Sequence, residues 1–133
     1  MKYIKLFAFV AVLAATAACS VDNSGDDTCI RDIYTGVSSI TGPDNAIVDE
    51  PIELEASITT ANTCGTFSGF AQSAGYPKEI VAVVTYQGCH CDPVGETTTE
   101  TYTFKEDEAG TYVLKFLKPD NTFLTKIITV SEE

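Results

Sequence analysis

Residues 52–59 of the chain read Ile52-Glu53-Leu54-Glu55-Ala56-Ser57-Ile58-Thr59. Apolar and polar side chains alternate along this stretch without interruption, and successive side chains of a β-strand point to opposite faces. Pro51 stands just before it, at a position where the missing N–H of a proline is tolerated. The stretch therefore predicts a strand that buries one face in a core and turns its glutamates to water.

Similar patterns continue to the C-terminus. The dense apolar run 80–86 is typical of a central strand, and the turn residues Pro119-Asp120-Asn121 separate two alternating segments that predict a hairpin. No apolar residues recur at helical spacing after residue 32. The strands expected on these grounds cover residues 52–59, 66–70, 80–86, 97–104, 112–117 and 123–130. About seven short strands separated by turns, without helices, predict an all-β fold, a single antiparallel β-sandwich.

Residues 108–112 read Glu108-Ala109-Gly110-Thr111-Tyr112. This segment resembles the acid-x-Gly-x-Tyr corner of immunoglobulin-like domains, and the resemblance covers residues 37–130. It implies that Gly110 and Tyr112 form a structural corner in which the tyrosine hydroxyl bonds to nearby backbone. Leu114 then takes the place where antibody domains carry a cysteine. The chain has no tryptophan, so it departs from the antibody type.

The N-terminus has the pattern of a secretory signal. Two lysines precede an apolar run over residues 6–18, which ends in small residues before Cys19. This run is too short to cross a bilayer, which takes about 20 residues. The ending resembles the lipobox of bacterial lipoproteins, although Thr16 stands where a leucine is usual. The resemblance implies that residues 1–18 form a signal helix that is removed, and that Cys19 carries the lipid; cleavage without lipidation is the alternative.

The residues after Cys19 imply a location and a tether. Ser20, in place of an aspartate, points to the outer membrane by the enterobacterial sorting rule. The small and acidic residues that follow resemble the tether that carries lipoproteins to the cell surface in Bacteroidetes-like bacteria; a solvated linker without an export role fits as well. The expected organisation is a signal peptide (1–18), a flexible acidic linker (19–31) and a β-sandwich domain (32–133).

The chain is strongly acidic, with a net charge of −11 from 8 basic and 19 acidic residues. Removal of Lys2 and Lys5 with the signal leaves 6 basic residues against 19 acidic ones, a formal charge of −13. Such a surface repels the phosphate backbone of nucleic acids and favours solubility. We therefore expect no nucleic-acid partner, and contact with the membrane through the lipid on Cys19.

Four cysteines follow Cys19: Cys29, Cys64, Cys89 and Cys91. An even number of cysteines in an exported chain predicts two disulfides. A bridge between Cys89 and Cys91 would close a very tight ring. Cys29 is therefore expected to pair with one of these two residues and Cys64 with the other, and the spacing leaves open which.

The only histidine of the chain, His90, lies between Cys89 and Cys91. Two thiolates and an imidazole suit zinc or copper(I), so a small metal-handling protein is one alternative function. That alternative requires reduced cysteines, whereas the disulfide hypothesis makes His90 a turn residue. Because no Gly-x-Ser-x-Gly motif accompanies the single histidine, we expect neither an enzyme nor a bound cofactor.

The surface loop expected over residues 70–77, which begins where the expected strand 66–70 ends, holds Phe70 and Tyr76 among small residues. Loops at the ends of a sandwich often hold binding residues. We therefore predict that these two aromatic residues contact a protein or glycan ligand. The expected function is that of a membrane-anchored lipoprotein with a non-catalytic, immunoglobulin-like binding domain; an enzyme inhibitor that presents the loop 64–77 is the second alternative.

Overall fold

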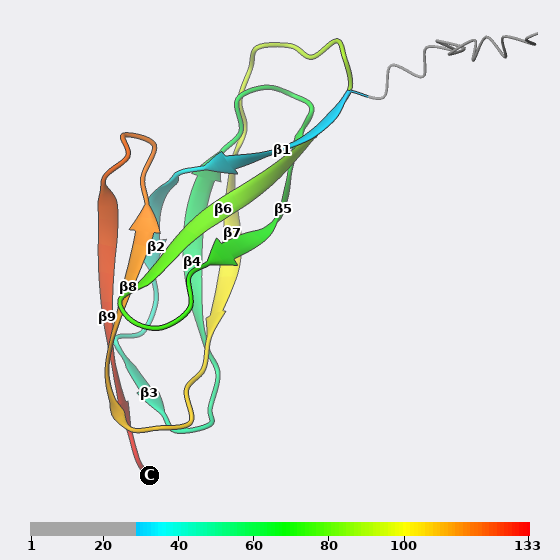
Figure 1. The fold of residues 1–133 in the computed structure, drawn as a ribbon. Helices are drawn as coiled ribbons and strands as arrows, with labels where there is room; N and C mark the ends of the chain where they lie inside the picture. Colours follow the sequence, from blue (N-terminus) through cyan, green and yellow to red (C-terminus); the bar gives the residue numbers. More distant parts are fainter. Residues whose placement is uncertain (1–28) are drawn as a thin grey trace, which may run out of the picture.

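The computed structural model describes residues 29–133; the predicted signal helix, Cys19 and residues 20–28 of the linker lie outside the described residues. Within residues 29–133 the chain forms nine strands (Figure 1). They are β1 Ile30–Thr35, β2 Val37–Thr41, β3 Asn45–Ile47, β4 Ile52–Thr59, β5 Gly65–Gln72, β6 Lys78–Gln87, β7 Thr97–Phe104, β8 Gly110–Leu117 and β9 Phe123–Ser131. The same part of the chain contains no helix with the length and apolar character that crossing a bilayer requires.

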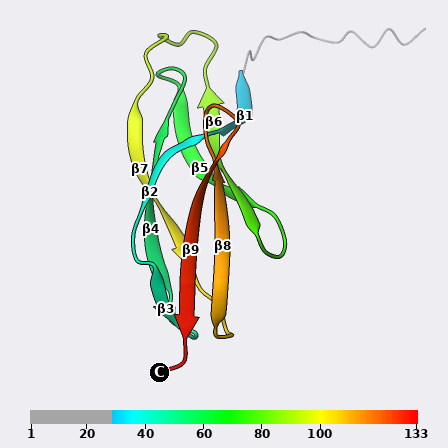
Figure 2. The same cartoon turned by 90° about the vertical axis from the view of Figure 1, so that its left-hand side faces the viewer.

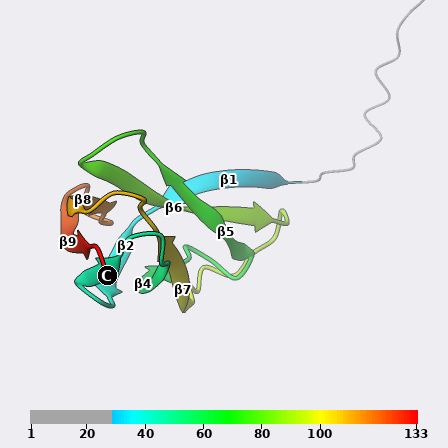
Figure 3. The same ribbon diagram turned by 90° about the horizontal axis from the view of Figure 1, so that it is seen from below.

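The strands form two sheets that face each other, as a β-sandwich requires (Figures 2 and 3). The six-stranded sheet has the order β1-β6-β8-β9-β3, with β5 also paired to β6. The three-stranded sheet has the order β2-β4-β7. Most pairs are antiparallel, but β3 with β9 and β6 with β8 are parallel, which corrects the expectation of a wholly antiparallel sandwich.

The core lies between the two sheets and is filled by alternate residues of each long strand. In β4, Leu54, Ala56 and Ile58 are fully buried while Glu53 and Glu55 face water, as the alternation predicted. Burial of such apolar side chains is the main favourable term in folding. The later strands add Ile80, Ala82, Val84, Tyr86, Tyr102, Phe104, Leu114, Phe116, Ile128 and Val130.

Three strands precede Pro51, where the sequence predicted none; with the six strands expected after it they make nine, against the expected total of about seven. β1 is mostly exposed, whereas β2 and β3 are short and each bury one core residue, Val37 and Ala46. None of the three shows a clear alternation of apolar and polar side chains over its length. They form because β1 pairs with β6, β2 with β4 and β3 with β9. Since β1 begins at Ile30, the sandwich starts before the predicted boundary at Asp32.

β6 is the central strand of the six-stranded sheet, as its dense apolar run predicted. β5 pairs along one edge of it. The other edge is divided, because β1 pairs with residues 82–87 and β8 with residues 78–80. Just after β1, Gly36 passes so close to Pro119 that a Cβ atom there would overlap the proline backbone. The outer face of the sheet is therefore interrupted where β1 and β8 end.

The predicted C-terminal hairpin is present, with β9 paired to all of β8. Asp120 fixes its turn by accepting hydrogen bonds from the Thr122 N–H at 3.0 Å and from the Thr122 hydroxyl at 2.5 Å. These hydrogen bonds hold the pKa of the Asp120 carboxyl below its ordinary value. Asn121 adopts the left-handed conformation, with φ of 62°, that asparagine tolerates in turns.

The corner residues Gly110 and Tyr112 lie at the start of β8. The Tyr112 hydroxyl donates to the Glu108 carbonyl at 2.8 Å, which joins the loop after β7 to this strand. The Tyr112 ring packs edge-on against Phe104, with 5.8 Å between the ring centres. Leu114 is fully buried in the core. The hydrogen bond is of the kind that the resemblance to the tyrosine corner implies.

We expect Tyr112→Phe to lower the urea midpoint of unfolding, because it leaves the Glu108 carbonyl without its donor while keeping the ring contacts. The control is Tyr34→Phe, at a side chain that is 71% exposed, which should leave the midpoint unchanged. Equal midpoints for the two variants would mean that the corner hydrogen bond does not stabilise the fold.

Candidate binding surface on the six-stranded sheet

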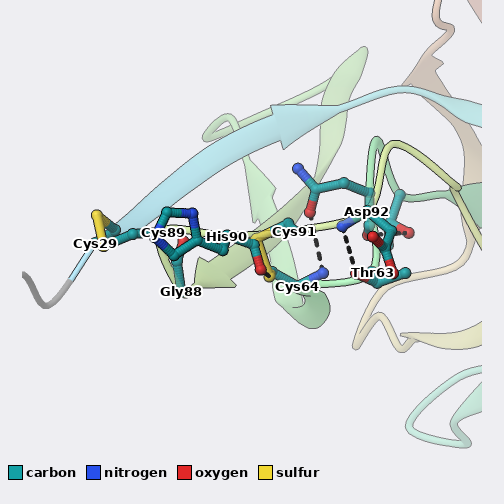
Figure 4. Close-up of a disulfide and its surroundings, with 10 residues drawn as sticks. Cys29, Thr63, Cys64, Gly88, Cys89, His90, Cys91 and Asp92 are labelled. Carbon is teal, nitrogen blue, oxygen red and sulfur yellow. Dashed lines mark hydrogen bonds between the residues drawn. A yellow bond between two sulfur atoms is a disulfide. The ribbon is translucent and has the colours of Figure 1, made fainter.

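Two disulfides, Cys29–Cys89 and Cys64–Cys91, close the end of the sandwich where β1 begins (Figure 4). They confirm the prediction that the four cysteines form two disulfides. Cys29 pairs with Cys89 and Cys64 with Cys91, a choice that the spacing had left open. Because Cys89 and Cys91 are both oxidised, the metal-site alternative at Cys89, His90 and Cys91 loses its thiolates. Within residues 29–133, no group of three His, Cys, Asp or Glu side chains is placed to hold a metal ion.

Phe70 is a strand residue, which corrects the predicted binding loop. It lies in β5, and its ring packs edge-on against Phe67 and Tyr102, with 4.9 Å and 5.5 Å between ring centres. Tyr102 donates its hydroxyl to Gln72 at 2.7 Å, and burial together with the nearby Glu106 carboxylate raises the pKa of Tyr102 to about 12. Phe70 therefore belongs to the half-buried margin of the core and not to an exposed ligand site.

Tyr76 does lie between β5 and β6, but several contacts hold it in place. Its ring packs against Tyr112, with 4.8 Å between ring centres, and the Lys78 ammonium lies 4.7 Å from the ring centre. Its hydroxyl donates to the Glu106 carboxylate, and burial together with this hydrogen bond raises the pKa of Tyr76. The loop therefore uses Tyr76 to attach itself to the domain, so the structure does not favour it as a free binding residue.

Large apolar side chains are exposed instead on the outer face of the six-stranded sheet, which points away from the core. Tyr34 is 71% exposed, Ile127 53% and Phe123 41%. Phe123 and Ile127 each precede a residue that packs in the core, so the pleat of β9 turns them outward. Tyr34 pairs with Val83, which alternates with core residues of β6 and so lies on the same outer face. Clustered exposed apolar residues of this kind mark interaction surfaces. We call the following set the outer apolar face: Tyr34, Ala71, Val81, Leu117, Phe123 and Ile127.

A hollow of about 280 Å³ lies on the outer apolar face, where β1 and β8 end beside β6. Tyr34 lines it from β1 and Phe123 from β9, with Val81 and Leu117 from the strands between them. Glu79 is the charged residue of its lining. An apolar hollow with few polar groups is the usual form of a binding site on a protein surface.

Strand pairing arranges four of these residues in a row across the sheet. Ala71 of β5 pairs with Val81 of β6, and Leu117 of β8 pairs with Phe123 of β9. Val81 and Leu117 each follow directly on the last paired residues of β6 and β8. The row therefore runs in the order Ala71, Val81, Leu117, Phe123.

One acidic and one basic residue lie beside this apolar row. Glu79 of β6 pairs with Lys115 of β8, so their side chains leave the sheet on the same face and at the same level along the strands. The Lys115 ammonium lies 5.9 Å from the centre of the Phe123 ring. The surface next to the hollow thus carries one charge of each sign.

Comparison of the chain with protein-family models, with curated protein sequences and with solved structures found no match. What can be inferred about its function therefore comes from the fold and the surface of the chain itself.

The outer apolar face could not be assembled from the sequence, although some signals were visible. In the run 80–86, Val81 and Val83 alternate with the core residues, and a strand that faces water on its other side would carry polar residues there. Tyr34 lies in a strand that the sequence did not predict. The parallel pairing of β6 with β8, which brings Val81 next to Leu117, has no local sequence signal.

Proposed function

We propose that the protein is a bacterial lipoprotein whose sandwich is a non-catalytic, immunoglobulin-like interaction module. The observation that carries this proposal is the outer apolar face, since exposed apolar residues around a hollow are typical of a surface that a partner covers. The Tyr112–Glu108 hydrogen bond and the two packed sheets support the immunoglobulin-like character. The partner is a protein or a glycan that contacts this face.

The two disulfides support a location outside the cytoplasm, because disulfides persist mainly in oxidising compartments. This agrees with the export signal at the N-terminus. In the proposal, the lipid on Cys19 holds the protein at the outer membrane, and Ser20 directs it there.

The anchor would place the disulfide end of the sandwich nearest the membrane. The chain between Cys19 and Cys29 can span at most about 35 Å when fully extended. The C-terminus lies at the opposite end of the sandwich from the start of β1 (Figure 1). With this orientation the outer apolar face, which runs along the strands between the two ends, is directed sideways toward neighbouring proteins.

The lipid anchor is tested with Cys19→Ala in cells grown on labelled palmitate. The wild-type chain is expected to take up the label and to fractionate with membranes, and Cys19→Ala is expected to lose both properties. Ser20→Ala, at the neighbouring residue, serves as the control and should keep the label. Unchanged membrane fractionation of Cys19→Ala would contradict the anchor.

A further inference from the structure

We propose that the partner of the outer apolar face is a second copy of this chain, related to the first by a two-fold axis that runs parallel to the strands between β6 and β8. The inference rests on the proposed function, an interaction module, and names the partner of that module. Three features support it: the charges of the face, the sizes of its side chains, and the position of Cys29, where the chain leads toward Cys19.

The charges of the face are self-complementary about this axis. A two-fold axis between β6 and β8 carries β6 of one copy over β8 of the other. Because Glu79 and Lys115 lie at the same level on these strands, the rotation brings Lys115 opposite Glu79 of the second copy, and the reciprocal contact forms at once. Opposite charges therefore meet at this face, although the formal charge of −13 expected after removal of the signal, from 6 basic and 19 acidic residues, makes two copies repel each other elsewhere.

The outer face of the three-stranded sheet has no such complementarity. It carries Glu53 and Glu55, whose cross-strand partners are Thr103 and Thr101. Two copies that met through that sheet would bring carboxylates together without a basic residue among these pairs, which disfavours association.

The side chains of the apolar row are also complementary in size. The row runs Ala71, Val81, Leu117, Phe123 across β5, β6, β8 and β9. The same two-fold rotation reverses its order, so Phe123 meets Ala71 of the second copy and Val81 meets Leu117. The largest residue of the row then faces the smallest, which allows close packing of the two faces.

The direction of the axis agrees with anchoring in one membrane. A rotation about an axis parallel to the strands preserves their direction, so the Cys29 ends of both copies leave the dimer on the same side. The four strands lie side by side only near residues 79–81 of β6, because β5 pairs with residues 80–86 of β6 and β8 with residues 78–80. The face that two copies share is therefore smaller than the roughly 800 Å² that each partner buries in a standard interface. We therefore expect a weak dimer that is favoured when both copies are held on one membrane.

The test exchanges the two charges in the full-length chain, extracted from membranes and studied by analytical ultracentrifugation in detergent. The wild type is expected to show a concentration-dependent equilibrium between monomer and dimer. Glu79→Lys places a lysine against Lys115 of the second copy and should weaken the dimer by about tenfold or more, since like charges at an interface are strongly unfavourable. The double variant Glu79→Lys/Lys115→Glu restores opposite charges and should recover the dimer.

The control is Glu55→Lys on the three-stranded sheet, which changes the net charge equally and should not weaken the dimer. A wild type that stays monomeric at every concentration would overturn the inference, and so would equal effects of Glu79→Lys and Glu55→Lys. Palmitate label in the same samples separates the proposed lipid anchor from the proposed dimer. A labelled protein that stays monomeric would contradict the dimer but would agree with the lipid anchor.

Discussion

The double variant Cys64→Ser/Cys91→Ser is expected to lose about 3.5 kcal/mol of unfolding free energy. The bridge joins residues separated by 27 positions and encloses β5 and β6, so its loss restores chain entropy to the unfolded state. Urea unfolding of the oxidised proteins, followed by far-ultraviolet circular dichroism, measures the difference. A variant that unfolds at the wild-type midpoint would mean that the bridge does not lower the entropy of the unfolded chain by the expected amount.

The other bridge provides the comparison. Cys29 and Cys89 are separated by 60 positions, for which the same chain-entropy relation gives about 4 kcal/mol. Because β1 is mostly exposed and lies at the start of the described chain, part of the loss in Cys29→Ser/Cys89→Ser should be local. Faster hydrogen exchange in residues 30–35, before any change in the core strands, would identify that part.

Phe116→Ala is expected to lower the unfolding free energy by about 3–5 kcal/mol, the range for truncating a fully buried phenylalanine. Phe116 has no exposed surface, and its ring packs edge-on against Tyr102 with 5.4 Å between ring centres. The matched control is Phe123→Ala, at a ring that is 41% exposed, measured at a concentration where the protein is monomeric. We expect the control to lose about 1 kcal/mol or less. Similar losses in both variants would contradict the placement of Phe116 in the core.

The sequence predicted those strands that bury one face and expose the other. The bounds of β4 and β7 match the predicted ranges 52–59 and 97–104. β4 alternates apolar and polar residues throughout, whereas β7 is threonine-rich and alternates polar with aromatic residues only over residues 101–104. The two disulfides were also expected, since the predicted export signal and the even number of cysteines after Cys19 both favour disulfide formation. The alternation of residues along a strand therefore predicted which of its faces is buried.

The features that the sequence did not predict depend on contacts between distant segments. β1 is exposed on both faces over most of its length and is held by pairing with β6. The expected strand ended at Phe70, where a loop rich in glycine and small residues was predicted to begin, whereas β5 continues to Gln72 through its pairing with β6. The hollow requires β1 and β8 to end beside the same strand, and no residue within either strand signals that arrangement.

The Cys29–Cys89 bridge has a mechanical consequence for a tethered protein. Tension on the chain before Cys29 would otherwise act first on β1, whose mostly exposed residues could peel away from β6 one pair at a time. The covalent bond instead transmits the load to Cys89, two residues beyond the end of β6. A pull from the membrane side therefore enters the fold at Cys29 and Cys89 together, and the residues between the two cysteines, β1 and β6 among them, cannot be extended while the bond remains closed.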